Sequence, residues 1–334
     1  MLHRTKISIQ GQLVTTCLGF EKPYGLTLDN GKILVCDLGL NTVFRLSLDL
    51  EPEAVLQSKD QTFEWSPCPS NHQKIDSSEL SGPHSICKLS SGATIIANYF
   101  GKNLICFDET GKITHKICNK TFDISLEGVA SVSEAPNHTI WLVDFDGHKL
   151  VNINSEYKII QQIGEFEVID KKKNARRTKK KGGFDNPHMI SFINDGTFVV
   201  VETGNNRLQC FTKNKDLEDY KSEEQGNTLK TLHGLESKFN KPVSVHYVED
   251  GYLIVADNGN DRILKISTTG RPTKIFSFQE RTGKFNWSDS NINACCASAF
   301  FKRPFHAIET HNSLYVADGW NSRILKFENL LKDD

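Results

Sequence analysis

The apolar residues of this chain fall in short runs that recur along its whole length. Each run is rich in β-branched side chains and is bounded by turn residues, which is the pattern of strands buried on both faces. The runs group into units that each predict three consecutive strands. The clearest units cover residues 184–211, 239–266 and 301–327, and weaker copies cover residues 20–46, 80–107 and 126–153. Six copies of one unit indicate an all-β repeat protein.

An acidic or amide residue follows the second apolar run of every unit. This anchor position holds Asp37, Asn98, Asp144, Glu202, Asp257 and Asp318. Six and nine positions after the anchor, every copy is apolar again. Several anchors lead into turns rich in Gly and Asn, where the side chain can accept hydrogen bonds from its own turn. We therefore expect the anchors to stabilise hairpins.

A single blade of this size cannot bury both of its faces, so the units are expected to stack around an axis as a six-bladed β-propeller. The whole chain, residues 1–334, would form one domain. Residues 6–17 precede the first unit and would supply the outer strand of the last blade, closing the ring. The anchors lie further apart than the roughly 40 to 45 residues of a compact blade, and we expect the surplus in loops on the propeller faces. The main insertions are residues 47–79, 155–183, 212–238 and 268–300.

The signature Val-Ala-Asp-x-x-Asn-x-Arg-Ile occurs at residues 255–263 and 316–324. It resembles the repeat of the NHL family, and the resemblance covers nearly the whole chain. It implies a six-bladed propeller. It implies no single function, because NHL propellers include enzymes, RNA-binding modules and protein scaffolds.

Two units place a histidine directly after the repeat proline, at the start of the innermost strand. These are His84 and His188, and the third alternate unit has His306 one residue later. Three imidazoles from alternate blades would meet on the axis as in a catalytic three-histidine zinc site, so we expect zinc or another divalent metal there. Because an offset of one residue turns a side chain to the opposite face, His306 reaches the axis only through a β-bulge, and otherwise Phe305 takes its place. The alternative is that these histidines line a channel and bond to water or carbonyl groups.

The Pro-His pattern on alternate blades is also similar to the metal site of peptidyl-α-hydroxyglycine α-amidating lyase, an NHL-type propeller enzyme. The local similarity is closest at residues 186–190 and 206–211. That resemblance implies a tyrosine and arginines near the mouth of the channel. The candidates in this chain for a base or an orienting group are Tyr24, Tyr99 and Asp146.

The amino-acid composition argues against several classes of protein. Hydrophobic residues make up 38% and charged residues 24% of the chain, and the net charge is −1, which argues against disorder and against a globally basic nucleic-acid binder. No apolar stretch approaches the roughly 18 residues of a membrane helix, and the first ten residues contain no apolar core of a signal peptide. Several cysteines fall inside apolar runs, as expected in a reducing compartment. These features predict a cytoplasmic protein.

One segment, residues 171–181, carries eight positive charges. Such a block repels itself, and the simplest interpretation is a surface loop. Alternatively it contacts nucleic acid or an anionic membrane, or serves as a nuclear-import signal. The contact residues would be Lys171, Lys172, Lys173, Arg176, Arg177, Lys179, Lys180 and Lys181.

Two function classes remain. The first is a binding propeller whose partner is a protein, a nucleic acid or a small molecule. The second is a metal-dependent lyase or hydrolase, in which a metal on the axis polarises the substrate or lowers the pKa of bound water. The sequence favours binding, because it offers two well-placed histidine ligands, a third that is offset, and no assigned base.

Overall fold

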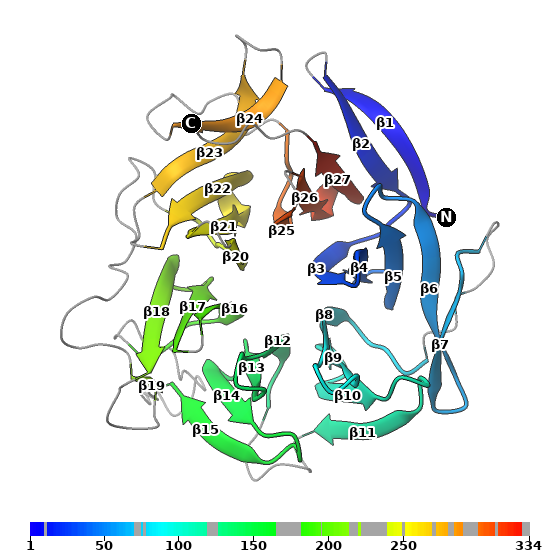
Figure 1. Cartoon of the computed structure of the whole chain (residues 1–334), viewed down its shortest axis with the longest axis vertical. Coiled ribbons are helices and arrows are strands. Elements are labelled where there is room, and N and C mark those ends of the chain that lie inside the picture. The colour runs from blue at the N-terminus through cyan, green and yellow to red at the C-terminus, as the bar shows by residue number, and fades with distance from the viewer. Residues whose placement is uncertain are drawn as a thin grey trace, which may run out of the picture.

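The structure is a computed structural model, and its blades form a closed ring (Figure 1). It describes residues 1–9, 12–69, 75, 78–118, 126–164, 182–194, 196–213, 220–221, 239–248, 251–268, 272–279, 284–289, 300–310 and 313–328. Six antiparallel sheets of four or five strands are the blades. The predicted six-bladed β-propeller is confirmed. In the part of the chain described, no helix is long and apolar enough to cross a membrane.

Each blade begins at the axis and runs outward. The innermost strands are β3 (Pro23–Asp29), β8 (Pro83–Lys88), β12 (Val129–Glu134), β16 (Pro187–Asn194), β20 (Ser244–Val248) and β25 (Pro304–Thr310). The second strands are β4 (Lys32–Asp37), β9 (Thr94–Asn98), β13 (Ile140–Asp144), β17 (Thr197–Glu202), β21 (Tyr252–Asp257) and β26 (Ser313–Asp318). The third strands are β5 (Thr42–Ser47), β10 (Asn103–Phe107), β14 (Lys149–Ile153), β18 (Arg207–Lys213), β22 (Arg262–Ser267) and β27 (Arg323–Phe327). The fourth strands of the first five blades are β6 (Pro52–Lys59), β11 (Ile113–Cys118), β15 (Ile159–Ile163), β19 (Tyr220–Lys221) and β23 (Pro272–Gln279).

The N-terminal segment closes the ring, as the sequence predicts. Strand β2 (Gln12–Leu18) pairs antiparallel with β27 of the last blade, and β1 (His3–Ile9) pairs with the outer edge of β2. The Thr16 hydroxyl also donates a hydrogen bond to the carbonyl oxygen of Ile324, at 3.0 Å. The last blade is thus completed by the first strands of the chain, so its third strand is not left as an open edge.

Two of the insertions differ from the expectation. Residues 47–79 and 268–300 were expected as loops, but they contain β7 (Thr62–Pro67) and β24 (Lys284–Asp289), which add a fifth strand to the first and fifth blades. Aromatic packing accompanies both added strands: in the fifth blade Trp287 on β24 contacts Phe276, which also contacts Phe327 of the last blade, and in the first blade Phe63 on β7 contacts Phe107 of the second. The Ala-, Cys- and Phe-rich stretch at residues 293–301 also predicts a short helix, and residues 293–299 of it lie outside the described part of the chain.

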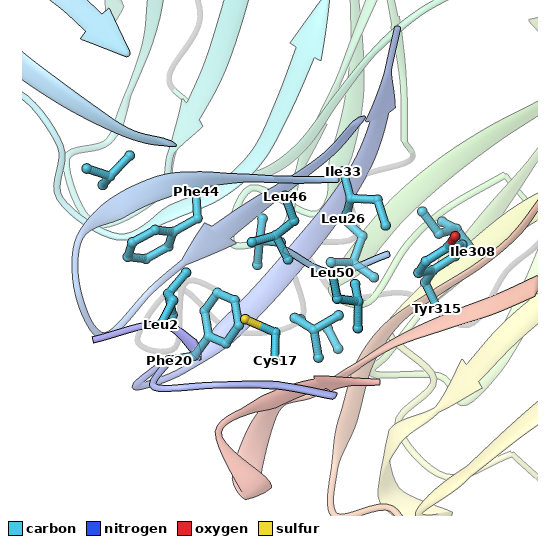
Figure 2. Packing of buried hydrophobic residues seen from close by; sticks show 14 residues of the cluster. Leu2, Cys17, Phe20, Leu26, Ile33, Phe44, Leu46, Leu50, Ile308 and Tyr315 are labelled. Carbon is cyan, nitrogen blue, oxygen red and sulfur yellow. The ribbon is translucent and has the colours of Figure 1, made fainter. Parts of the chain in front are cut away.

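The core consists of apolar layers between neighbouring blades. Figure 2 shows the layer that joins the last blade to the first, in which Cys17, Ile33, Leu46 and Tyr315 are almost fully buried. The Tyr315 hydroxyl crosses this layer and donates to the Leu48 carbonyl at 2.9 Å. Burial raises the pKa of the Cys17 thiol to about 12, so this cysteine packs as a small neutral hydrophobe.

The anchors stabilise the hairpins, as their sequence context suggests. Asp257 accepts the backbone N–H of Asn240 at 2.8 Å and a charged hydrogen bond from Arg262 Nε at 2.7 Å, and the anchors of the other blades accept equivalent backbone N–H groups. The fourth residue after every anchor has a left-handed backbone, with φ between 50° and 54°. Those residues are Asn41, Lys102, His148, Asn206, Asp261 and Ser322. The anchor therefore ties the end of one strand to a tight turn and to the segment before the innermost strand.

Candidate functional site

The residue after the repeat proline leaves the strand ladder. In the second blade Pro83 pairs with Asn98 and Ser85 pairs with Ala97, so His84 between them has no partner in the ladder. The same β-bulge leaves out His188 in the fourth blade and Phe305 in the sixth. Tyr24 and Ala130 lie in equivalent bulges of the first and third blades. A bulge redirects a side chain, and here it directs these residues to the axis.

Four of these side chains form one aromatic group on the axis, which we call the axial cluster: Tyr24, His84, His188 and Phe305. The Tyr24 ring stacks between His84 and Phe305, with ring centres 4.2 Å away on each side. The Tyr24 hydroxyl also lies 2.7 Å from Nε2 of His188. Because the first and fourth blades face each other across the ring (Figure 1), this contact spans the axis.

His306 lies in a different position from His84 and His188. The required bulge exists, but it falls at Phe305, which takes the position equivalent to His84 and His188. The imidazole of His306 reaches the first blade, where its Nδ1 accepts the backbone N–H of Leu26 at 2.8 Å. Its Nε2 is buried and has no hydrogen-bond partner in the described structure.

The donor set can be compared with the needs of a zinc ion, which requires three ligand atoms with free lone pairs. Nε2 of His188 is engaged with Tyr24, and Nδ1 of His306 is engaged with Leu26. Among the residues that the structure describes, no three His, Cys, Asp or Glu side chains are placed to hold a metal ion together. This arrangement does not fit the three-histidine zinc site, and metal binding by His84, His188 and His306 stays a prediction.

The buried imidazoles of the site are neutral at pH 7. Burial lowers the pKa of His188 to about 4 and that of His306 to about 3, and it lowers the pKa of His84 well below its usual value. Burial also raises the pKa of the Tyr24 hydroxyl, so that side chain is protonated. The axial cluster therefore offers hydrogen-bonding groups without net charge.

A cavity of about 730 Å³ follows the axis and is lined by residues from all six innermost strands. We call it the axial cavity. Its lining includes the four residues of the axial cluster and continues to the opposite ends of the strands, at Asn30, Ser90 and Glu134. Tyr99, which stacks on the other face of His84, is not part of the lining. The axial cluster is thus the floor of a cavity that extends toward one face of the propeller.

The three catalytic candidates from the sequence separate into two places. Tyr24 belongs to the floor, whereas Tyr99 and Asp146 lie in turns after second strands, where the Tyr99 hydroxyl donates to Asp146 Oδ2 at 2.7 Å. A side chain at Gly128 would approach Asp146 Oδ2 within 2.6 Å and the Tyr99 ring within 2.9 Å, so this pair packs closely against backbone that only glycine allows. The pair supports His84 from outside the cavity.

Sequence reasoning missed two serines of the cavity wall, Ser131 and Ser244, which lie two positions after the repeat-proline position, as does His306. Aligning the units on that position would have shown that the neighbouring position is polar in several blades. The basic segment, residues 171–181, lies outside the described residues. Nucleic-acid binding through it stays a prediction, and salt-dependent retention of RNA or DNA that disappears on deletion of residues 171–181 is the measurement that checks it.

No protein-family model matches the sequence, and no curated protein matches it. Solved structures are similar in fold. Virginiamycin B lyase from Staphylococcus aureus has a TM-score of 0.52 at 15% identity, over 99% of this chain and 100% of that chain. A gluconolactonase from Xanthomonas campestris has a TM-score of 0.58 at 9% identity, over 94% and 89%. An auxiliary nutrient binding protein from Bacteroides thetaiotaomicron has a TM-score of 0.59 at 12% identity, over 92% and 69%.

At these identities the similarity shows the fold alone. The neighbours include enzymes and a binding protein, so they are compatible with both function classes that the sequence leaves open. The resemblances to the NHL family and to the amidating lyase stay predictions.

Proposed function

We propose that this protein binds a small organic molecule in the axial cavity. The observation that carries the proposal is a cavity of about 730 Å³ that reaches all six blades and ends on the axial cluster. That volume lies within the usual range of small-molecule sites, roughly 300–1,000 Å³. A closed floor with convergent hydrogen-bonding groups also favours a compact ligand over a macromolecule.

A variant that fills the cavity tests this proposal. Ser133 lies in the cavity wall on β12, and the Ser133→Trp substitution places a large ring in the ligand space. We expect compounds from a small-molecule library to raise the melting temperature of the wild-type protein and not that of Ser133→Trp. At a ligand concentration of 100 times Kd, binding adds about 2.7 kcal/mol to the free energy of unfolding.

The matched control is Ser66→Trp, the same substitution on the peripheral strand β7. This variant should respond to ligands as the wild-type protein does. Equal stabilisation of wild type and Ser133→Trp by every compound would place binding elsewhere and overturn the proposal.

A second candidate is lyase or hydrolase activity, and the contact between Tyr24 and His188 favours it. The Tyr24 hydroxyl lies 2.7 Å from Nε2 of neutral His188, so the pair holds one group that can donate a proton and one that can accept it. Burial moves the pKa of both groups away from 7, so the chemistry requires that a bound molecule brings them back toward it. Among proteins of this fold, a virginiamycin B lyase variant in which a histidine is replaced by alanine is catalytically inactive. We therefore assign the acid–base roles to Tyr24 and His188.

Mass spectrometry of bound compounds tests this activity. Tyr24→Phe and His188→Gln should still bind the ligand but should convert it at least 100-fold more slowly than wild type. Unchanged conversion in both variants would remove the pair from the reaction. Bound zinc, measured in wild type and in the double variant His84→Ala, His188→Ala, decides the metal hypothesis, and equal, near-zero metal in both would end it.

A further inference from the structure

Four buried polar atoms of residues that line the axial cavity have no hydrogen-bond partner in the part of the chain that the structure describes. They are His84 Nδ1, Ser131 Oγ, Ser244 Oγ and His306 Nε2. Each of the four residues is less than one-tenth exposed. An unsatisfied buried donor or acceptor costs about 1–3 kcal/mol, so four of them around one cavity indicate that something other than protein satisfies them.

Neighbouring residues show that this lack of partners is specific. Ser85 and Thr27 lie on equivalent innermost strands, and their hydroxyls bond to the backbone of the next blade, at Val132 and Ile86. Ser191 likewise accepts the backbone N–H of Tyr247 at 2.9 Å. The blade-to-blade hydrogen bond is therefore available in this architecture, and Ser131 and Ser244 do not make it.

The four atoms surround the axis. They come from the second, third, fifth and sixth blades, on strands β8, β12 and β25 and at the start of β20. A ligand that satisfies several of them at once must carry hydrogen-bonding groups that point outward in different directions. Each atom is buried as well as unpartnered, so a ligand in the cavity reaches it only after the side chain turns. The serine hydroxyls turn by rotation about χ1 and the His84 ring by a flip within its stack, whereas His306 must give up its hydrogen bond from Leu26.

The floor of the cavity carries no formal charge. Its imidazoles are neutral at pH 7, and the charged residues of the lining, Asp29, Lys88 and Glu134, lie at the far ends of the innermost strands. A charged ligand on this floor would lose its hydration without gaining a counter-charge, which is costly. The site therefore favours an uncharged molecule.

Two of the four rings of the floor have both faces covered. Tyr24 is covered by His84 on one face and Phe305 on the other, and His84 is covered by Tyr24 and Tyr99. A flat aromatic ligand cannot stack on Tyr24 or His84, so at these two rings the ligand meets ring edges and polar atoms. Ring edges are the positive part of the aromatic quadrupole and attract oxygen atoms.

We propose that the axial cavity binds an uncharged, polyhydroxylated ring, such as a monosaccharide or a cyclic polyol, whose hydroxyl groups bond to His84, Ser131, Ser244 and His306. Hydroxyl groups are both donors and acceptors, so they suit serine hydroxyls and neutral imidazoles alike. This inference rests on the proposed function, because it names the class of ligand for the same cavity.

Titration with matched compounds tests the class of ligand, with the imidazole proton signals of His84 and His306 as the NMR readout. The panel consists of neutral hexoses and cyclic polyols of varied stereochemistry, the matching sugar acids and amino sugars, and aromatic alcohols of similar size. We expect at least one neutral polyol to shift both histidine signals saturably, at a concentration at which its acid and amine counterparts shift neither.

The experiment distinguishes a failure of this ligand assignment from a failure of the proposed function. If sugar acids, amino sugars or aromatic alcohols shift the two signals and neutral polyols do not, the cavity is a ligand site and this assignment of its ligand is wrong. If no compound shifts either signal, ordered water alone satisfies the four atoms, and the proposed function fails with it.

Serine variants provide a second test. Ser131→Ala and Ser244→Ala each remove one hydroxyl and should each weaken binding of the neutral polyol about 3- to 10-fold, the effect of losing one hydrogen bond. Ser66→Ala, on the peripheral strand β7, is the matched control and should leave the affinity unchanged. Unchanged affinity in both cavity variants would overturn the assignment of these contacts.

Discussion

Tyr24 and His188 are 164 positions apart in the chain, yet their side chains are in hydrogen-bond contact across the axis. The sequence indicates that His84 and His188 face the axis, because both follow the repeat proline. It does not indicate which side chains meet there, because that depends on how six blades close and where each bulge falls. The one-residue offset of His306 shows the difficulty, since Phe305 takes the equivalent position and His306 bonds to Leu26 instead.

The lowered pKa of His188 predicts a pH-dependent stability. Its pKa is about 4 in the folded protein and about 6.5 in an unfolded chain, so the unfolded state takes up a proton first as the pH falls. The contribution of neutral His188 to the free energy of unfolding is fully present above pH 6.5 and is lost as the pH falls from 6.5 to 4. At pH 5 the loss is about 2 kcal/mol. Urea unfolding at pH 7 and pH 5 should show a loss of stability that is smaller in His188→Gln by about this amount.

The exposed His3 gives the control for this measurement. His3→Gln should keep the pH dependence of the wild-type protein, because its side chain is exposed in the folded state. Comparing variants cancels the opposite contribution of buried carboxyls such as Asp37, whose pKa burial raises. If His188→Gln loses as much stability as wild type between pH 7 and pH 5, His188 is not the buried neutral group described here.

At the scale of the element, the anchors are the residues whose structural role the sequence predicted best. Their spacing predicted a hairpin function from local chemistry alone, and Asp257, Asp318 and Glu202 each accept a backbone N–H and a hydrogen bond from an arginine five residues later. The third blade has Lys149 at that offset, with Nζ 3.6 Å from the carboxylate of Asp144. The fifth strands were not predicted, because their apolar residues pack on other blades and show no relation to the repeat.

Asp257→Ala should destabilise the protein by about 3–5 kcal/mol. The substitution removes the buried carboxylate that accepts hydrogen bonds from Arg262 Nε and from the backbone N–H of Asn240. Denaturant unfolding measures the loss. The control is Glu156→Ala in the exposed pair with Lys158, which should change stability by less than about 1 kcal/mol. Similar small losses in both variants would mean that the anchor contributes little to the hairpin.

At the scale of the whole molecule, the number of blades and the closure of the ring followed from the sequence because both are consequences of burial. Each unit has two apolar faces, and six units with a spare N-terminal strand satisfy all of them only in a closed ring. The cavity and its floor depend on side chains from opposite blades. Contacts such as that between Tyr24 and His188 carry no signal in a single sequence, whatever the quality of the repeat.

Because β2 closes the ring of blades, a proline in this strand should strongly destabilise the protein. This strand lies between β1 and β27, and Thr16 pairs with Thr5 on one side and Leu325 on the other. Thr16→Pro removes a ladder N–H in a strand with neighbours on both sides and should cost about 3 kcal/mol or more. Because a displaced β2 exposes the edge of β27, we also expect aggregation that increases with concentration, measured by light scattering.

Thr16→Ala separates strand pairing from the side-chain contact. Alanine keeps the ladder and loses only the hydroxyl bond to the Ile324 carbonyl, so it should cost about 1 kcal/mol and cause no aggregation. Equal destabilisation by Pro and Ala would mean that the hydroxyl, and not the pairing of β2 with β27, holds the ring closed. A larger loss with Pro, accompanied by aggregation, means that the N-terminal strand protects the last blade from pairing with other chains.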